Sequence, residues 1–186
     1  VPVEDEEVAK VLERSFKKQK IKCELGIEIK SAGVTEECVS IEYVKKGKTI
    51  NLDVDAVIQA VGVAANLEGA VGESLELKTD RGFLVVDDRY ETNVKGIYAA
   101  GDIIGPPTLA HVATFEAIQA VNGMFGVSEP RRVTNFPGCT YCQPQVASTG
   151  ITEKQAVESG IEFKIGKFPF AASGKAVASN ASEGFV

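Results

Sequence analysis

Apolar residues recur at helical spacing near the start of the chain and alternate with polar residues directly afterwards. Residues 4–19 predict an amphipathic helix, with acids early and lysines late, an order that suits the helix dipole. Its apolar face holds Val8, Val11, Leu12, Ser15 and Phe16. Four strand-like runs follow at 21–25, 27–31, 38–44 and 48–52. Because Lys45-Lys46-Gly47-Lys48 is typical of a tight turn, the last two runs are predicted to form a hairpin.

Two later runs are continuously apolar, which is typical of strands that are buried on both faces. Residues 55–63 predict a strand that returns into a buried sheet and ends at Gly62. Ile97–Ala100 predicts a second buried strand, which stops abruptly at Gly101-Asp102. Open α/β sheets bind their ligands at the carboxyl ends of the strands. We therefore expect a ligand site at this turn, where Asp102 offers a carboxylate.

A helix is predicted directly after this turn. The loop Gly105-Pro106-Pro107 leads into a helical pattern from about Leu109 to Phe125. The start of the helix would then lie close to Asp102. Since a helix N-terminus carries unpaired N–H groups and a partial positive charge, it suits an electron-rich ring or a phosphate.

The pattern changes after residues 128–132, which contain Pro130 and form the best candidate for a domain boundary. Beyond it we predict an α+β arrangement. Thr152 and Gln155 fit a capping box at the start of a short helix, which Gly160 closes. The predicted elements are strands at 142–149 and 163–170 and a helix at 152–159, while 83–87 is a short strand earlier in the chain.

The composition narrows the classes of partner. The chain has 186 residues, 25% of them charged, and a formal net charge of -6, which argues against nucleic acid or an anionic membrane as the main partner. No apolar run approaches the ~20 residues of a membrane-spanning helix, and no signal-peptide pattern opens the chain. We expect a cytoplasmic protein. The chain begins with Val1 and breaks off without an obvious final element, so we interpret it as a fragment.

The four cysteines are typical of a reducing compartment rather than of a disulfide scaffold. Cys23 and Cys38 stand among apolar neighbours and predict core thiols. Cys139 and Cys142 form a Cys-x-x-Cys pair, which can be a redox dithiol or half of a zinc site. Zinc needs two further ligands at a matching spacing, and a redox pair favours a helix start, whereas Pro144 and a strand-like run follow here. We therefore predict no metal site and favour a structural role.

The block around Gly101 carries a resemblance to a known family. An apolar run, Gly101-Asp102, a Gly/Pro loop and Thr108-Leu109-Ala110-His111 at the start of a helix resemble the second flavin-binding segment of the pyridine nucleotide–disulfide oxidoreductases. The Leu109–His111 triplet is most similar to the dihydrolipoyl dehydrogenases within that family. The resemblance implies an α/β fold, part of a flavoprotein with two dinucleotide-binding domains plus the start of an α+β interface domain.

The same resemblance implies a division into three parts and a set of binding residues. Residues 1–62 resemble the C-terminal part of an NAD-binding domain, 63–127 the second segment of an FAD-binding domain, and 128–186 the start of an interface or dimerisation domain. By this resemblance Asp102 would bind the ribityl chain of FAD, and the segment Thr108, Leu109, Ala110 and His111 would lie along the flavin. Gly62 would approach NAD closely and Ile29 would pack near its adenosine half. His111 would be a positioning residue rather than a catalytic one.

The activity implied is the oxidation of dihydrolipoamide, with electrons passing through a disulfide and FAD to NAD. The implied partners are the lipoyl groups of 2-oxo acid dehydrogenase complexes and a second copy in a homodimer, and the implied process is cell redox homeostasis. The alternatives are another FAD-dependent disulfide reductase of the family and, from a different class, a non-catalytic interaction or dimerisation module.

Some features of the family pattern are missing or altered. No Gly-x-Gly-x-x-Gly and no Cys-x4-Cys occurs in the sequence, so no catalytic residue is predicted and the chain alone is expected to be inactive. Val63-Ala64-Ala65-Asn66 stands where the family has Arg-x-Pro-Asn, and Cys142-Gln143-Pro144-Gln145 where it has Thr-x-Pro-Glu.

Overall fold

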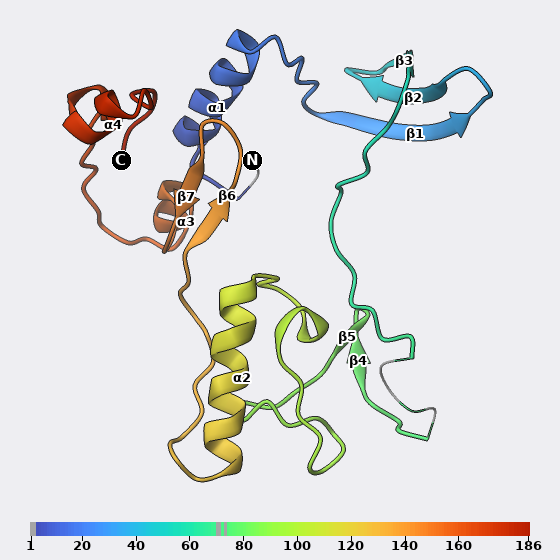
Figure 1. The fold of residues 1–186 in the computed structure, drawn as a ribbon, viewed down its shortest axis with the longest axis vertical. Coiled ribbons are helices and arrows are strands. Elements are labelled where there is room, and N and C mark those ends of the chain that lie inside the picture. The colour runs from blue at the N-terminus through green and yellow to red at the C-terminus, as the bar shows by residue number, and fades with distance from the viewer. Residues whose placement is uncertain (1–2, 70–71, 73) are drawn as a thin grey trace. The chain divides into compact units, whose positions relative to one another are not determined.

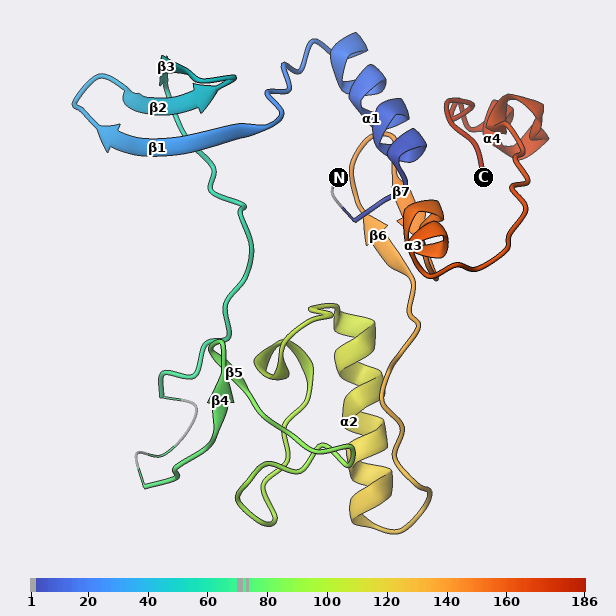
Figure 2. The same ribbon diagram turned by 180° about the vertical axis from the view of Figure 1, so that it is seen from behind.

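The computed structural model describes residues 3–69, 72 and 74–186, which fall into two compact units (Figures 1 and 2). The first unit contains the chain up to Val61, together with Tyr141–Val146 and Ile151–Val186. The second unit contains Gly62–Thr140 and Ala147–Gly150. Both contain helices and antiparallel strands, so the predicted α/β class is confirmed in its general form.

The first unit begins with helix α1, Glu6–Lys18. Leu12 and Ser15 are buried, and the rest of the predicted apolar face is half-buried, as the spacing predicts. The hydroxyl of Ser15 and the ammonium of Lys18 both donate to the carboxylate of Glu183, at 3.1 and 2.7 Å. These hydrogen bonds, that of Lys18 first, lower the pKa of Glu183. Polar contacts thus join α1 to the C-terminal segment.

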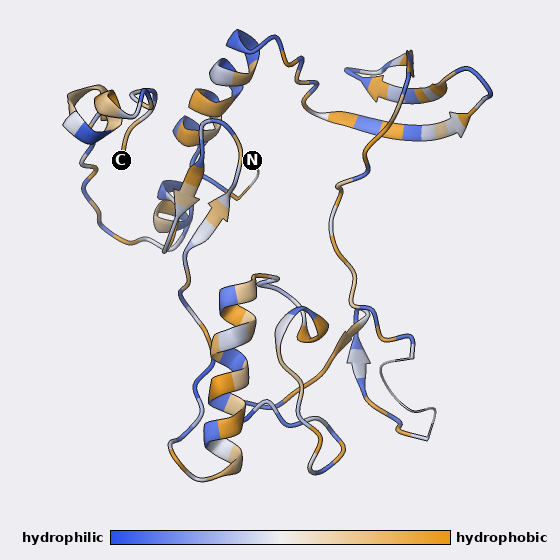
Figure 3. Ribbon diagram, viewed as in Figure 1, coloured by the Kyte–Doolittle hydropathy of each residue, from blue (hydrophilic) through white to orange (hydrophobic). Residues whose placement is uncertain are grey.

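An antiparallel sheet of three strands follows, in the order β1 (Ile27–Val34), β2 (Val39–Lys45) and β3 (Lys48–Val54). Hydrophobic and hydrophilic positions alternate along its strands (Figure 3). Lys46 and Gly47 both have positive φ angles, 50° and 77°, which the mirror-image turns of tight hairpins require. Lys45 pairs with Lys48 across this turn, so the predicted hairpin is confirmed.

The C-terminal part of the first unit is made of short elements. Helix α3, Glu153–Glu158, begins with the predicted capping box of Thr152 and Gln155. The backbone N–H of Glu153 donates to the carboxylate of Asp5 at 2.8 Å, which joins α3 to the start of α1. A 3₁₀ turn η2 (Phe170–Ala172) and helix α4 (Gly174–Ala178) follow.

The second unit is organised around helix α2, Ala110–Met124, which confirms the helix predicted from Leu109. Strands β4 (Thr79–Asp80) and β5 (Phe83–Leu84) form a two-stranded sheet, and the 3₁₀ turn η1 (Gly101–Ile104) packs against α2. Tyr90 is completely buried, and β5 is shorter than predicted. Strands β6 (Gly138–Thr140) and β7 (Val146–Ser148) pair with each other.

Several predicted strands are wrong among the residues described. The apolar run at 55–63 leaves β3 as irregular backbone, with Ile58 92% exposed. An apolar run forms a strand only where another strand pairs with its backbone, and no partner for this one is present in the described ranges. The segment 21–25 forms no strand for the same reason, and of 142–149 only 146–148 does. Cys23 is consequently exposed rather than in the core, and Cys38 is half-buried. Of 163–170 only the end pairs, through an antiparallel bridge between Pro169 and Phe185.

The predicted strand at Ile97–Ala100 is also corrected. The backbone of Ile97 accepts a hydrogen bond from Thr92 N (2.8 Å), and Ala99 N donates to the carbonyl of Tyr90 (3.0 Å). Only this one edge is paired in the part of the chain that is described, and the residues are half-buried. Tyr98 pairs with Glu91 in an antiparallel bridge, so the ligand turn does not follow a strand of a parallel sheet among the residues described. In the described residues no helix is long and apolar enough to cross a bilayer.

Candidate functional site at the start of helix α2

The turn at Gly101-Asp102 is fixed by close contact with α2. Gly101 has a φ of +80°, and a Cβ added there would lie 2.9 Å from the Cβ of Ala113. Glycine is therefore required both by the backbone conformation and by the lack of space. The backbone N–H of Gly101 donates to Oε2 of Glu116 at 2.7 Å, a buried contact.

Asp102 lies exposed in the first turn of η1. Its carboxylate has no hydrogen-bond or ion-pair partner among the residues that the structure describes, whereas its carbonyl accepts from Gly105 N at 3.2 Å. Gly105 in turn has a φ of +99° and would place a Cβ 3.3 Å from the ring of Phe83. The backbone on both sides of Asp102 is thus held by packing, while the carboxylate stays available to a ligand.

The start of α2 leaves backbone donors without acceptors. Leu109 is the N-cap residue, and it makes no side-chain capping bond because leucine has no acceptor. The first intrahelical bond runs from Ala113 N to the carbonyl of Leu109, at 3.0 Å. The N–H groups of the three residues between them therefore point out of the helix end with no acceptor in the described chain. They coincide with the positive end of the helix dipole.

His111 is tied to the segment that follows α2. Its Nε2 lies 2.9 Å from the carbonyl oxygen of Pro137. Since a carbonyl can only accept, Nε2 carries the hydrogen in this contact, and in the neutral ring Nδ1 is then the free acceptor. His111 and Phe115 line one side of a hollow of about 340 Å³, and residues 131–137 line the other. The contact joins the start of α2 to the segment after the helix, and the positioning role of His111 stays a prediction.

The buried side chain of Tyr90 packs next to the segment that leads into the site. The hydroxyl of Tyr90 donates to the carbonyl of Arg131 at 2.9 Å, and the guanidinium of Arg132 lies 5.0 Å from the ring centre. Burial raises the pKa of Tyr90, and the nearby carboxylate of Glu116 raises it further. The phenol therefore stays protonated and acts as a donor. The backbone carbonyl of Tyr90 also accepts from Ala99 N, so it fixes the segment that leads into Gly101.

Sequence reasoning missed Glu116 and Tyr90. The buried residues of α2 follow the spacing i, i+4, i+8, and a glutamate occupies the middle of an otherwise apolar or small stripe. A charged residue at such a position was the available signal for Glu116. Tyr90 gives no comparable signal, because its burial depends on contacts with residues about 40 positions later.

Comparison with known proteins decides the family. Residues 1–117 match the profile of the family described as pyridine nucleotide-disulphide oxidoreductase, and residues 136–186 match the dimerisation domain of that family. The first match alone spans more than half of the chain. This chain belongs to the pyridine nucleotide–disulphide oxidoreductase family.

Relatives within the family are similar over the whole chain. It is 41% identical to a dihydrolipoyl dehydrogenase of Rhizobium etli over 192 residues, and 38% identical to that of Bacillus subtilis over 189 residues. All of this chain is covered in both alignments, against 39% and 40% of the two relatives. The chain thus spans about two-fifths of the length of the relatives it matches.

Two solved structures share the fold. The copper(II) complex of the flavoprotein disulfide reductase RclA from Escherichia coli superposes with a TM-score of 0.86 at 24% identity, over 100% of this chain and 42% of that one. LpdA from Mycobacterium tuberculosis superposes with a TM-score of 0.79 at 25% identity, over 98% of this chain and 39% of that one. At 24% identity, the similarity to RclA shows a shared fold and nothing further.

Ile29 and Gly62, the two residues predicted to approach NAD, lie in different units of this chain. Ile29 is on β1, 58% exposed, beside a bulge between Ile29 and Ser31. Gly62 is exposed with a φ of +142°, a conformation that side chains disfavour, and a Cβ there would meet nothing within 4 Å. The division of the chain at 62 and 127 and the roles of these residues stay predictions.

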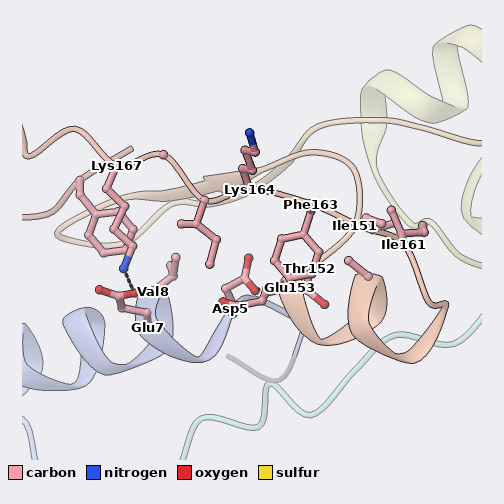
Figure 4. Close-up of a pocket in the computed structure, with 14 residues that line it drawn as sticks. Asp5, Glu7, Val8, Ile151, Thr152, Glu153, Ile161, Phe163, Lys164 and Lys167 are labelled. Atoms are coloured by element: carbon pink, nitrogen blue, oxygen red, sulfur yellow. Dashed lines mark hydrogen bonds and ion pairs between the residues drawn. The ribbon is translucent and has the colours of Figure 1, made fainter.

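The first unit holds a separate pocket of about 360 Å³ (Figure 4). The ion pair of Glu7 and Lys167 stands at one end, and Val8 and Phe163 contribute apolar surface. None of the predicted binding residues lines it. Within the described ranges no group of three or more His, Cys, Asp or Glu side chains could hold a metal ion.

Proposed function

We propose that this chain is part of an FAD- and NAD-dependent dihydrolipoyl dehydrogenase, which oxidises dihydrolipoamide and reduces NAD. One observation carries the proposal at the level of the site. The carboxylate of Asp102, which has no partner among the described residues, and the start of α2, which has no side-chain cap, belong to one packed arrangement held by the contacts of Gly101 with Ala113 and Glu116. The similarity of the whole chain to dihydrolipoyl dehydrogenases selects the substrate.

The polar groups of this arrangement match FAD. The ribityl chain of FAD offers hydroxyl donors, which a carboxylate accepts, and the N1/C2 edge of the flavin offers acceptors, which backbone N–H groups satisfy. Asp102 therefore binds the ribityl chain, and the N–H groups of Ala110, His111 and Val112 face the flavin edge. When bound, FAD supplies electron transfer between a dithiol and NAD.

The residues at the start of α2 then have defined tasks. The start of α2 stabilises negative charge at the flavin edge, because its dipole and N–H groups point there without a competing cap. Thr108 and Leu109 lie along the flavin as the segment that enters the helix. His111 holds this segment against Pro137 through Nε2. The redox dithiol and the proton-transfer groups belong to other parts of the whole protein.

The remaining assignments follow from the same family. Gly62 allows close approach of NAD, because a residue without a side chain tolerates its φ of +142°, and Ile29 packs near the adenosine half. Residues 136–186, which match a dimerisation domain, contribute to a homodimer. The partners are lipoyl groups of 2-oxo acid dehydrogenase complexes, in the cytoplasm, and the process is redox homeostasis.

The full-length protein tests this proposal. It should purify with a flavin absorbance spectrum and reduce NAD when supplied with dihydrolipoamide. Glutathione disulfide with NADH or NADPH should support no comparable turnover. A yellow protein that reduces another disulfide, and not lipoamide, would instead favour a different reductase of the family. A colourless protein that binds no added FAD would favour an interaction or dimerisation module.

A further inference from the structure

Glu116 is unusual for a residue in the middle of a helix. It is only 6% exposed, and glutamate is almost never buried unless a partner compensates its charge. No lysine, arginine or histidine in the described chain lies within ion-pairing distance of it. Its described hydrogen-bond partner is the backbone N–H of Gly101, at 2.7 Å. A buried carboxylate is thus devoted to one peptide group.

The position of that peptide group explains the arrangement. Ala113 and Glu116 are three residues apart on α2, so they share a helix face, and both meet Gly101. Ala113 limits how far the turn can move toward the helix, and Glu116 draws its N–H inward. The backbone at Gly101 can therefore move neither toward the helix nor away from it. Because Asp102 is the next residue, its position is restrained as well.

An apolar side chain would serve helix packing better than a carboxylate here. The other buried residues of this stripe are Val112, Ala120 and Gly123, and burying a charge carries a desolvation cost that a methionine of similar length would avoid. The charge also reaches Tyr90, whose pKa it helps to raise. The glutamate is thus explained by the buried N–H of Gly101, which needs an acceptor, and not by the packing of the helix.

We propose that Glu116 is a positioning residue that acts through Asp102, holding the Gly101–Asp102 peptide so that the Asp102 carboxylate faces the ribityl chain of FAD. This inference rests on the proposed function and adds a residue that the sequence resemblance did not assign. Glu116 lies 14 positions beyond Asp102 and touches the turn rather than the ligand.

Replacing Glu116 in the full-length protein separates positioning from packing. Glu116→Met removes the acceptor but keeps a side chain of similar length. The buried Gly101 N–H then loses its partner, while a charge no longer has to be buried, so the two effects offset each other and the apoprotein should melt close to the wild type. Its affinity for FAD, titrated by flavin fluorescence, should nevertheless fall about tenfold, because the turn loses a charge-assisted hydrogen bond. Glu116→Gln retains a carbonyl acceptor and should rescue most of the affinity.

A matched control is available in the same unit. Glu91 accepts from the backbone N–H of Gly96, also at 2.7 Å, on a turn that carries no predicted site residue. Glu91→Met should leave FAD affinity unchanged. Asp102→Ala should weaken FAD binding by itself, and adding Glu116→Met to it should cause little further loss, because both changes remove the same contact.

The outcomes distinguish this inference from the proposed function. Loss of FAD affinity in Glu116→Met, rescue by Glu116→Gln and no further loss in the double variant support it. Wild-type affinity in Glu116→Met, with loss in Asp102→Ala, overturns the role of Glu116 and leaves the FAD site standing. Wild-type affinity in Asp102→Ala overturns both. Additive losses in the double variant show that Glu116 does not act through Asp102 and also overturn the inference.

Discussion

Helices α2 and α3 begin in opposite ways. At α3 the hydroxyl of Thr152 accepts from Gln155 N (3.2 Å), and the side chain of Gln155 accepts from Thr152 N (2.8 Å). At α2 neither bond forms, because neither the N-cap residue Leu109 nor Val112, at the position that corresponds to Gln155, has a side-chain acceptor. The capping box and Asp5, which accepts from Glu153 N, satisfy donors at the start of α3, whereas those of α2 have no acceptor in the described chain and remain available to a ligand.

The two starts also differ in what holds them. The start of α3 is held by its capping box and by the bond from Glu153 N to Asp5, and it carries no predicted binding residue. The start of α2 is placed by the turn at Gly101, through Ala113 and Glu116. Disturbing the first should therefore change stability alone, while disturbing the second should change ligand binding. A helix start with a structural role and one with a binding role can therefore be distinguished by measuring stability and FAD affinity separately.

The largest effect is expected from Gly101→Ala in the full-length protein. The new Cβ would meet Ala113 at 2.9 Å on a backbone with positive φ. The conformation costs about 1–2 kcal/mol and the overpacking about 1–3 kcal/mol, so unfolding free energy in a denaturant titration should fall by about 2–5 kcal/mol. Retained FAD should fall with it. Gly96→Ala is the control, because its φ is also positive but its Cβ would meet open space. Equal losses in the two variants would contradict the close packing.

A smaller effect is expected when α2 receives the cap that it lacks. Leu109→Asp would accept from the free N–H groups and place a negative charge at the flavin edge. The capping bond should stabilise the apoprotein by about 1 kcal/mol, while FAD affinity should fall severalfold.

Leu109→Ala is the control for this variant, because it removes the leucine side chain without adding an acceptor. FAD titration of both apoproteins measures the difference. If Leu109→Asp bound FAD as tightly as Leu109→Ala does, the open donors would not face the flavin.

Removing the existing cap should have the complementary result. Thr152→Ala deletes the hydroxyl that accepts from Gln155 N, while the backbone N–H of residue 152 can still donate to Gln155, and the unfolding free energy should fall by about 1 kcal/mol. Thr152→Ser keeps the hydroxyl and should restore most of it. FAD affinity and NAD-linked turnover should match the wild type in both variants. A fall in FAD affinity in Thr152→Ala would remove the contrast between the two helix starts.

The parts of the fold that could be predicted are those that neighbouring residues determine. The capping box of Thr152 and Gln155 and the hairpin at Lys46-Gly47 each depend on a few adjacent residues, and both are confirmed. The amphipathic face of α1 is likewise a property of one segment. Such features require no knowledge of distant partners.

The wrong strands fail for the opposite reason. The apolar runs at 55–63 and 97–100 have the composition of buried strands, but pairing depends on backbone supplied by distant segments. Ile97 and Ala99 pair on one edge with the nearby residues Thr92 and Tyr90, and no distant segment pairs with them in the residues described. At the candidate site the Gly-Asp turn and the following helix could be predicted. The contact of Glu116 with the turn could not, because it depends on how the turn packs against the helix.

The smallest effect is expected at Cys139 and Cys142, where no helix start is present at all. Cys139 is exposed on β6, and the thiol of Cys142 donates to the carbonyl of Pro144 at 3.0 Å. A redox thiol needs a lowered pKa, usually from a helix N-terminus or a nearby cation, and the residues after Cys142 lead into strand β7 instead. Replacing both with serine in the full-length protein should leave NAD-linked turnover within about twofold of wild type and metal content unchanged. Stoichiometric zinc in the wild type, absent from the double variant, would contradict this, as would a large loss of turnover. Either result would show that this Cys-x-x-Cys pair has a metal-binding or redox role without a helix start beside it.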